Sequence, residues 1–496
     1  MKNCFSCIIG AAAALGVVCG TASSSLAQSA PPAAVEQAKS VQRWRGEVEI
    51  PGSKLEFSIE LVGTGDTATG TMSIPSQGVK DAPLRDCKID GKNLKFTLGL
   101  PQMPEPAWAH FEATIGDDES KAEGLLNQGG AKLALHLTKM AAGESAEKAK
   151  PQDPVKPYLY TEREVQYTNA ADGTVLGGTL TIPEAAKFGS GPFTTVLLIT
   201  GSGAQNRDEE LMGHRPFLVI ADYLTRAGIA VLRVDDRGVG KSTSAKKGAE
   251  TTLDFATDVR AGVEFLKTQK EVDSARIGLA GHSEGGLIAP IVAADSKDVA
   301  FIVLLAGTGV NGHEILVVQM AAMMRAGGAA EAAIAPIQKV QGEALSAAEA
   351  GKSVELEAAL TELVKLQYGL GGQQPDEQQL SAAVKGAKAG LEQPWMKTFL
   401  TLDPRESLRK VKCPVLILNG GLDAQVVASQ NIPEITKALL AGGNQDFTVR
   451  VFPNLNHLFQ TCKTGGIAEY AAIEETFAPV VLDTMTSWIK SATPKT

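Results

Sequence analysis

A serine lies between two glycines in the segment IGLAGHSEGGLI, residues 277–288. Gly281, Ser283 and Gly285 form a G-x-S-x-G pattern between an apolar run typical of a strand and one typical of a helix. A sharp strand-to-helix turn needs glycines where side chains would collide, and it exposes the serine at the positive end of the helix. The pattern predicts Ser283 as a nucleophile; the alternative is an incidental serine in a glycine-rich turn.

A serine hydroxyl is a poor nucleophile until a base takes its proton, and that base has to come from another part of the chain. His457 lies in FPNLNHLFQ, directly after the last predicted strand, TVRVF. His282 is the immediate neighbour of the serine, and we expect it to point away from the hydroxyl and to pack. We therefore predict His457 as the base.

The imidazole needs an acid that fixes its tautomer. Asp423 follows the predicted strand PVLILN in the loop GGLDAQV, at the carboxyl end where functional loops gather. The chain order Ser283, Asp423, His457 is the one expected for a strand-and-helix fold with this serine turn. Asp403 is a reserve acid, but it precedes that strand and so lies at its other end. Taken singly, Asp423 could be a turn former and His457 a polar group at a helix edge.

Acyl transfer also needs two backbone N–H groups aimed at the oxyanion. One is predicted to be the N–H of Glu284, the residue after the nucleophile. The other is predicted in the loop after TVLLIT, which begins at Gly201, with Ser202 as the donor and Gly203 as the reserve. A flexible loop without this role is the alternative.

These residues have to be positioned by a scaffold, and strand patterns alternate with helical patterns throughout residues 158–496. The predicted strands read REVQYTN, TVLGGTLTIP, TVLLIT, IAVLRVD, ARIGLAG, AFIVLLAG, PVLILN and TVRVF. Such alternation predicts an α/β fold whose mostly parallel sheet is covered on both faces. An insertion at about 312–400, rich in Ala, Glu, Gln and Met, predicts a helical cap over the serine, or a decoration on the flank of the sheet.

Residues 41–140 follow a different pattern, in which apolar and polar residues alternate between turns. The predicted strands read RWRGEVEI, KLEFSIELV, ATGTMSI, NLKFTLGL, HFEATI and KLALHLTK. They predict a small antiparallel all-β domain, either a sandwich or a barrel. The charged, proline-bearing segment 141–157 is predicted to be a linker.

The first 27 residues resemble a signal peptide, with Lys2 before an apolar run and small residues before a cleavage point after Ala27. Residues 28–40 predict a flexible lead-in. We therefore expect an exported protein, periplasmic or extracellular; a lipoprotein modified at Cys19 and a membrane-anchored protein are the minor alternatives. No later apolar run is long enough to span a membrane.

Composition excludes some partners and cofactors. A net charge of −9 argues against nucleic acid, which requires a basic face. After the predicted signal peptide, metal-binding spacings such as CxxC or HExxH are absent, so we expect no metal and no cofactor. Cys413 and Cys462 are expected to lie at opposite ends of a strand of about 20 Å, too far apart for a disulfide. The oligomeric state is unknown from the sequence.

The segments TGSGAQNRDE, VDDRGVGKS, GHSEGGLIAP, LNGGLDAQV and LNHLFQ occur in this order. With them, residues from about 160 to 496 resemble the α/β-hydrolase superfamily, specifically bacterial carboxylesterases grouped with serine-aminopeptidase-like hydrolases. The resemblance implies hydrolysis of small carboxylic esters through an acyl-serine intermediate. The common His-Gly before the oxyanion donor is Thr200-Gly201 here, which leaves the second donor open. Asp235, Arg237 and Gly238 are expected to be structural.

Other functions remain open at this stage. An aminopeptidase could use Glu209 and Glu210, just past the oxyanion loop, to hold a substrate ammonium, although acidic loop residues are usually only solvated. A thioesterase would use the same nucleophile. A glycan- or cell-wall-binding module, with the hydrolase incidental, could use Trp44 and Trp108 as surface aromatics, although both also suit core packing.

Overall fold

The computed structural model describes residues 41–50, 53–74, 79–99, 108–128, 131–141 and 149–493. The predicted signal peptide and lead-in lie outside these residues, as does 142–148 of the predicted linker. The described residues divide into two compact units: 151–210 with 214–493, and those up to 150 with 211–213. In the part of the chain that the structure describes, no helix combines the length and hydropathy needed to cross a membrane.

The N-terminal unit is one antiparallel sheet. Its described strands are β1 (Val41–Ile50), β2 (Ser53–Val62), β3 (Thr69–Ile74), β4 (Val79–Pro83), β5 (Arg85–Asp90), β6 (Asn93–Leu98), β7 (Ala109–Ile115), β8 (Lys121–Gln128) and β9 (Ala131–Lys139). Their order is β4-β3-β2-β1-β9-β8-β7-β6-β5, so almost every strand pairs with its neighbour in sequence.

This sheet curls towards closure, which favours the barrel of the two predicted forms. Gly65, between β2 and β3, exchanges two backbone hydrogen bonds with Ile89 of β5, at 2.8 and 3.2 Å. The side chains turned inwards form one apolar core that includes Trp44, Phe57 and Phe111. Three strands of this sheet, β4, β5 and β8, were not predicted from the sequence.

The C-terminal unit is built on a second sheet. Its strands are β10 (Thr161–Thr168), β11 (Val175–Ile182), β12 (Phe193–Ile199), β13 (Ala230–Val234), β14 (Val272–His282), β15 (Phe301–Leu305), β16 (Val415–Gly420) and β17 (Phe447–Phe452). They lie in the order β10-β11-β13-β12-β14-β15-β16-β17. Pairing is antiparallel up to β13 and parallel from there to β17. The predicted fold class and mostly parallel sheet are confirmed.

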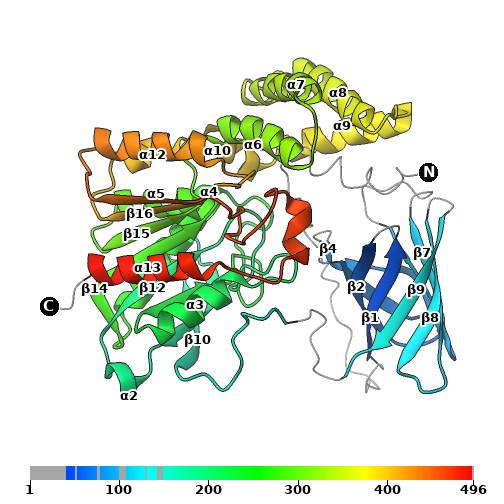
Figure 1. Cartoon of the computed structure of the whole chain (residues 1–496), viewed down its shortest axis with the longest axis horizontal. Helices are drawn as coiled ribbons and strands as arrows, with labels where there is room; N and C mark the ends of the chain where they lie inside the picture. The colour runs from blue at the N-terminus through cyan, green and yellow to red at the C-terminus, as the bar shows by residue number, and fades with distance from the viewer. Residues whose placement is uncertain are drawn as a thin grey trace. The chain divides into compact units, whose positions relative to one another are not determined.

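Helices cover both faces of this sheet (Figure 1). They are α2 (Ala185–Phe188), α3 (Pro216–Arg226), α4 (Thr252–Lys267), α5 (Glu284–Ala294), α11 (Pro404–Leu408), α12 (Ala428–Ala441), the 3-10 helix η3 (Ile467–Ala472) and α13 (Pro479–Ala492). Alternate residues of a strand face the two sides of the sheet: in β16, Ile417 belongs to the core that includes residues of α4 and α5, and Leu418 to the core that includes residues of α3 and α13. Because both of their faces are buried, central strands such as β15 and β16 are apolar runs.

The insertion predicted at 312–400, between β15 and β16, contains five helices; they form the layer at the top of Figure 1. They are α6 (Gly312–Ala326), α7 (Glu331–Glu349), α8 (Ser353–Leu370), α9 (Glu377–Leu391) and α10 (Pro394–Thr401). The side chain of Asn311 caps α6 by accepting from Glu314 N–H at 2.9 Å. The buried side chains of these five helices, including Met320 and Phe399, belong to the same core as those of α4 and α5.

Candidate active site

Ser283 occupies the predicted turn between β14, which ends at His282, and α5, which begins at Glu284. Its φ of 54° and ψ of −114° are a strained combination for a residue with a side chain. Both flanking glycines are required by space. A Cβ on Gly281 would lie 2.0 Å from the Gly285 oxygen, and one on Gly285 would lie 2.2 Å from the Ile199 oxygen.

The backbone of the turn is fixed from the neighbouring strand, because Ser283 N–H donates to the Leu305 oxygen at 2.9 Å. The serine is half-buried, whereas His282 and Glu284 on either side of it are buried. The turn therefore leaves the serine as its accessible residue, at the N-terminus of a buried helix.

Asp423 and His457, which are 34 residues apart, form a buried pair. His457 Nδ1 lies 2.9 Å from Asp423 Oδ2. Their side chains are 5% and 0% exposed, so water does not compete for this hydrogen bond. Donation from Nδ1 to the carboxylate leaves Nε2 of His457 as the nitrogen that can accept a proton.

The carboxylate of Asp423 is held by its own loop. Its Oδ1 accepts from the N–H groups of Gln425 and Val426, both at 2.8 Å, and its Oδ2 accepts from Asn419 Nδ2 at 3.2 Å. Asp403, the reserve acid, instead caps α11 and pairs with Arg405 at 2.8 Å. The structure therefore brings Asp423, and not Asp403, to His457.

His282, the residue before Ser283, lies against His457. The rings of His282 and His457 have centroids 4.7 Å apart, and His282 Nε2 lies 3.0 Å from the backbone oxygen of His457. Within the described residues, no hydrogen bond joins the Ser283 hydroxyl to the His457 ring. Such bonds often tighten only when substrate is bound.

The predicted oxyanion loop lies against the serine, since a Cβ on Gly201 would be 3.3 Å from the Ser283 Cβ. Asp236 fixes both ends of this loop. It accepts from Thr200 Oγ1 at 2.7 Å and from Gln205 N–H at 2.9 Å. Burial raises the pKa of Asp236 to about 8, so this carboxyl group holds its proton at neutral pH.

The loop also limits which amides can serve an oxyanion. The N–H of Gly201 is already bound to Glu209 Oε1 at 2.7 Å. Among the described residues, the N–H of Ser202 makes no hydrogen bond, and Glu284, as the first residue of α5, has an N–H without a partner in its helix. The predicted donors Ser202 and Glu284 are thus free for a ligand.

The side chain of Glu284 connects the turn to the cap. Its Oε1 accepts from Thr252 Oγ1 at 2.6 Å and from Trp395 Nε1, on α10, at 2.8 Å. Burial raises the pKa of Glu284, although both donors act in the opposite direction. Trp395 was not predicted from the sequence. Its hydrogen bond to Glu284 favours a cap that covers the serine over a decoration on the flank of the sheet.

The segment DDRGVGKS forms salt bridges with neighbouring segments, which agrees with the structural role predicted for it. Asp235 pairs with Arg207 at 2.7 Å, and Arg237 pairs with Asp258 at 2.7 Å. Gly238 has a φ of +79°, which favours glycine. The first pair joins the loops after β12 and β13, and the second joins the loop after β13 to α4.

Trp44 and Glu209, which were considered for the alternative functions, are both buried. Trp44 is 0% exposed, so it is no surface aromatic. Glu209 is 4% exposed and is bound to Gly201 and His282, so it is not free to hold a substrate ammonium. Trp108 is half-buried, with the Arg85 guanidinium 4.9 Å from its ring.

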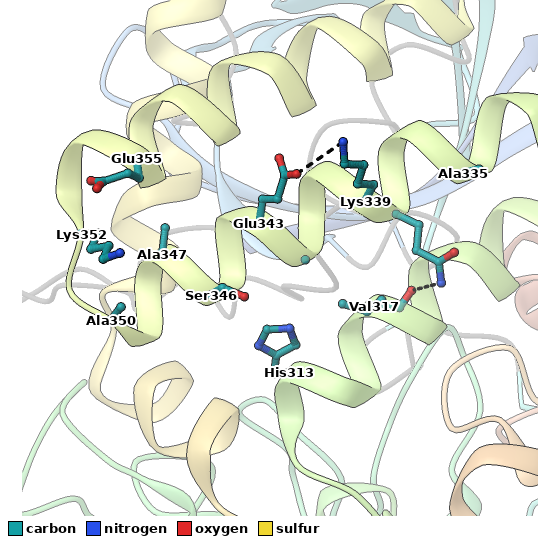
Figure 2. Close-up of a pocket in the computed structure, with 12 residues that line it drawn as sticks. His313, Val317, Ala335, Lys339, Glu343, Ser346, Ala347, Ala350, Lys352 and Glu355 are labelled. Atoms are coloured by element: carbon teal, nitrogen blue, oxygen red, sulfur yellow. Dashed lines mark hydrogen bonds and ion pairs between the residues drawn. The ribbon is translucent and has the colours of Figure 1, made fainter.

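Two cavities are prominent. A groove of about 710 Å³ lies among α6, α7 and α8 and is lined by His313, Lys339, Glu343 and small residues (Figure 2). None of the predicted site residues lines it. A cavity of about 50 Å³ lies under the oxyanion loop, where Gly201, Asp236 and Glu284 line it.

The described residues contain no group of three or more His, Cys, Asp or Glu side chains suited to a metal ion. Cys87, Cys413 and Cys462 are unpaired.

Comparisons with known proteins find similarity between the C-terminal unit and hydrolases. The family model described as serine aminopeptidase, S33, matches residues 215–461, which include Ser283, Asp423 and His457. Esterase EstD of Thermotoga maritima is 29% identical over 311 residues, covering 62% of this chain and 62% of the relative's own length. A solved esterase of Pyrococcus furiosus is 17% identical, with a TM-score of 0.42, over 69% of this chain and 96% of that one. The α/β-hydrolase GrgF from Penicillium is 16% identical, with a TM-score of 0.40, over 67% and 99%.

Proposed function

We propose that the C-terminal unit, which is an α/β-hydrolase, is a carboxylesterase acting on small carboxylic esters through an acyl-serine intermediate. The observation that carries this proposal is the buried Asp423–His457 pair beside a strained, accessible serine. Similarity to an esterase and to the S33 family supports a hydrolytic serine enzyme.

In the proposed mechanism the Ser283 hydroxyl attacks the ester carbonyl carbon while His457 Nε2 takes its proton. Asp423 stabilises the imidazolium. The N–H groups of Ser202 and Glu284 donate to the oxyanion of the tetrahedral intermediate. The bond to the alcohol oxygen then breaks, and His457 returns the proton to the departing alkoxide. A water molecule attacks the acyl-serine in the same way and releases the acid.

The direct test is Ser283→Ala, assayed with p-nitrophenyl acetate. We expect kcat to fall roughly 10⁴- to 10⁶-fold with the fold intact, because nucleophile, base and acid act as a unit. A variant that folds and keeps more than about a tenth of the wild-type rate would contradict the nucleophile assignment.

A second class of substrate distinguishes the proposed esterase from an aminopeptidase. We expect the wild type to hydrolyse p-nitrophenyl acetate far faster than aminoacyl anilides, because Glu209 is occupied behind the oxyanion loop. A preference for the anilides would favour the aminopeptidase instead.

A further inference from the structure

A second buried pair, Glu209 with His282, lies behind the candidate site, and the proposed mechanism does not use it. His282 Nδ1 is 2.9 Å from Glu209 Oε1, and the two side chains are 8% and 5% exposed. Glu209 also adopts a φ of +51°, which is unfavourable for a residue with a side chain. A strained backbone and a buried ionisable pair both cost stability, so a functional reason is worth seeking.

The proton positions in this pair follow from its acceptors. A backbone carbonyl only accepts, so His282 Nε2 donates to the His457 oxygen at 3.0 Å. His282 Nδ1 faces a carboxylate that already accepts from Gly201 N–H. Burial opposes a charge on the ring, but Glu209 outweighs it and raises the pKa of His282. Each ring nitrogen of His282 therefore faces an oxygen that can accept a hydrogen bond.

One chain of hydrogen bonds therefore joins the two halves of the site. It runs from the backbone of His457 through His282 and Glu209 to the N–H of Gly201. The next residue after Gly201 is Ser202, whose N–H is the proposed oxyanion donor. Because the Gly201 N–H is bound to Glu209, the N–H of Ser202 is the next one in the loop that remains for an oxyanion.

We propose that Glu209 is a positioning residue that fixes the oxyanion loop through Gly201 and, through His282, sets that loop relative to His457. The inference rests on the proposed function, because it concerns the donor geometry of that reaction. Glu209 acts through the loop backbone, and its effect belongs to the transition state, where the oxyanion forms.

The test compares two substitutions of nearly equal length. Glu209→Met removes the acceptor, whereas Glu209→Gln keeps an oxygen that can accept from Gly201 N–H. With p-nitrophenyl acetate we expect Glu209→Met to lower kcat about 10- to 100-fold and to leave KM within about threefold. Glu209→Gln is expected to restore kcat to within about fivefold of the wild type.

The control is Glu210→Ala, at the adjacent acid, whose carboxylate accepts from Asn206 Nδ2 at 2.7 Å. We expect its kcat within about twofold of the wild type. The rate at which a phosphonate probe labels Ser283 gives a second readout, because the probe forms a tetrahedral adduct. Labelling should slow in Glu209→Met in parallel with kcat.

The inference is overturned if a folded Glu209→Met keeps kcat within about threefold, or if the Gln and Met variants lose activity equally. Thermal unfolding of each variant shows whether it is folded; if the Met variant is not, Glu209→Ala takes its place with the same expected results. If all acceptor-free variants fail to fold while Glu209→Gln is folded but inactive, the inference is also wrong. A wild type that neither hydrolyses the ester nor is labelled at Ser283 would instead overturn the proposed function.

Discussion

The surroundings of Ser283 and the groove in the cap differ in how their polar groups are held. At the serine, the side chains of His457 and Asp423 are 5% and 0% exposed and form a hydrogen bond. In the larger groove, the side chains of Lys339 and Glu343 are 78% and 55% exposed. Lys339 Nζ lies 3.8 Å from Glu343 Oε1 (Figure 2). The larger cavity is only an opening between alanine-rich helices. Buried polar groups that are hydrogen bonded to one another mark the candidate site, because burying such groups costs free energy.

The largest effect that would sharpen this contrast is expected from Asp423→Asn. The amide would face His457 Nδ1 with a donor and favour the wrong tautomer, so we expect kcat to fall about 10³- to 10⁴-fold. Lys339→Ala in the groove is the control, with kcat within about twofold of the wild type. Esterase kinetics on both variants check this. A groove variant that lost as much activity as Asp423→Asn would break the comparison.

An intermediate effect is expected where the cap meets the turn. Trp395→Phe removes the Nε1 donor to Glu284, and leaving a buried acceptor short of a partner should lower the free energy of unfolding by about 1–3 kcal/mol. We also expect kcat to fall by up to about tenfold, because Glu284 carries a proposed oxyanion donor.

The matched control for this change is Trp488→Phe on α13, where Nε1 donates to Thr448 Oγ1 at 3.2 Å. That substitution should affect unfolding without changing kcat. Urea unfolding and esterase kinetics on the two variants separate the roles. Equal kcat values for the two variants would show that the hydrogen bond between Trp395 and Glu284 does not affect catalysis.

The smallest effect concerns the pH dependence of stability through Asp236. Burial raises the pKa of Asp236 to about 8 in the folded protein from an ordinary value of 3.8, so between these values the folded state holds a proton that the unfolded state has released. This group therefore makes the wild type less stable as pH rises from about 4 to 8. Asp236→Asn keeps one donor and one acceptor and lacks this titration. Urea unfolding at several pH values should show the wild type losing stability relative to the variant; parallel curves would contradict the buried, protonated carboxyl.

Much of the C-terminal unit was predictable because its central strands, such as β15 and β16, are buried on both faces and are apolar runs. Ser283, Asp423 and His457 could be proposed from the sequence because each lies in the segment that follows a predicted strand, here β14, β16 and β17. The strands VKDAP, RDCKID and KAEGLLNQ were missed because charged residues interrupt their alternation.

The contacts of Glu209 and Trp395 could not be predicted for a different reason. Their partners His282 and Glu284 lie 73 and 111 residues away, and no local pattern records those contacts. His282 was expected to pack and to point away from the serine. The structure shows that it does so while hydrogen bonding through both ring nitrogens.

The most direct measurement of the central claim is covalent labelling of the wild type with a phosphonate probe, followed by mapping of the modified peptide by mass spectrometry. We predict that Ser283 is labelled, that no other serine, Ser202 included, is modified, and that ester hydrolysis is lost in proportion to labelling. Labelling of a different serine, or ester hydrolysis that persists after Ser283 is fully modified, would contradict the account.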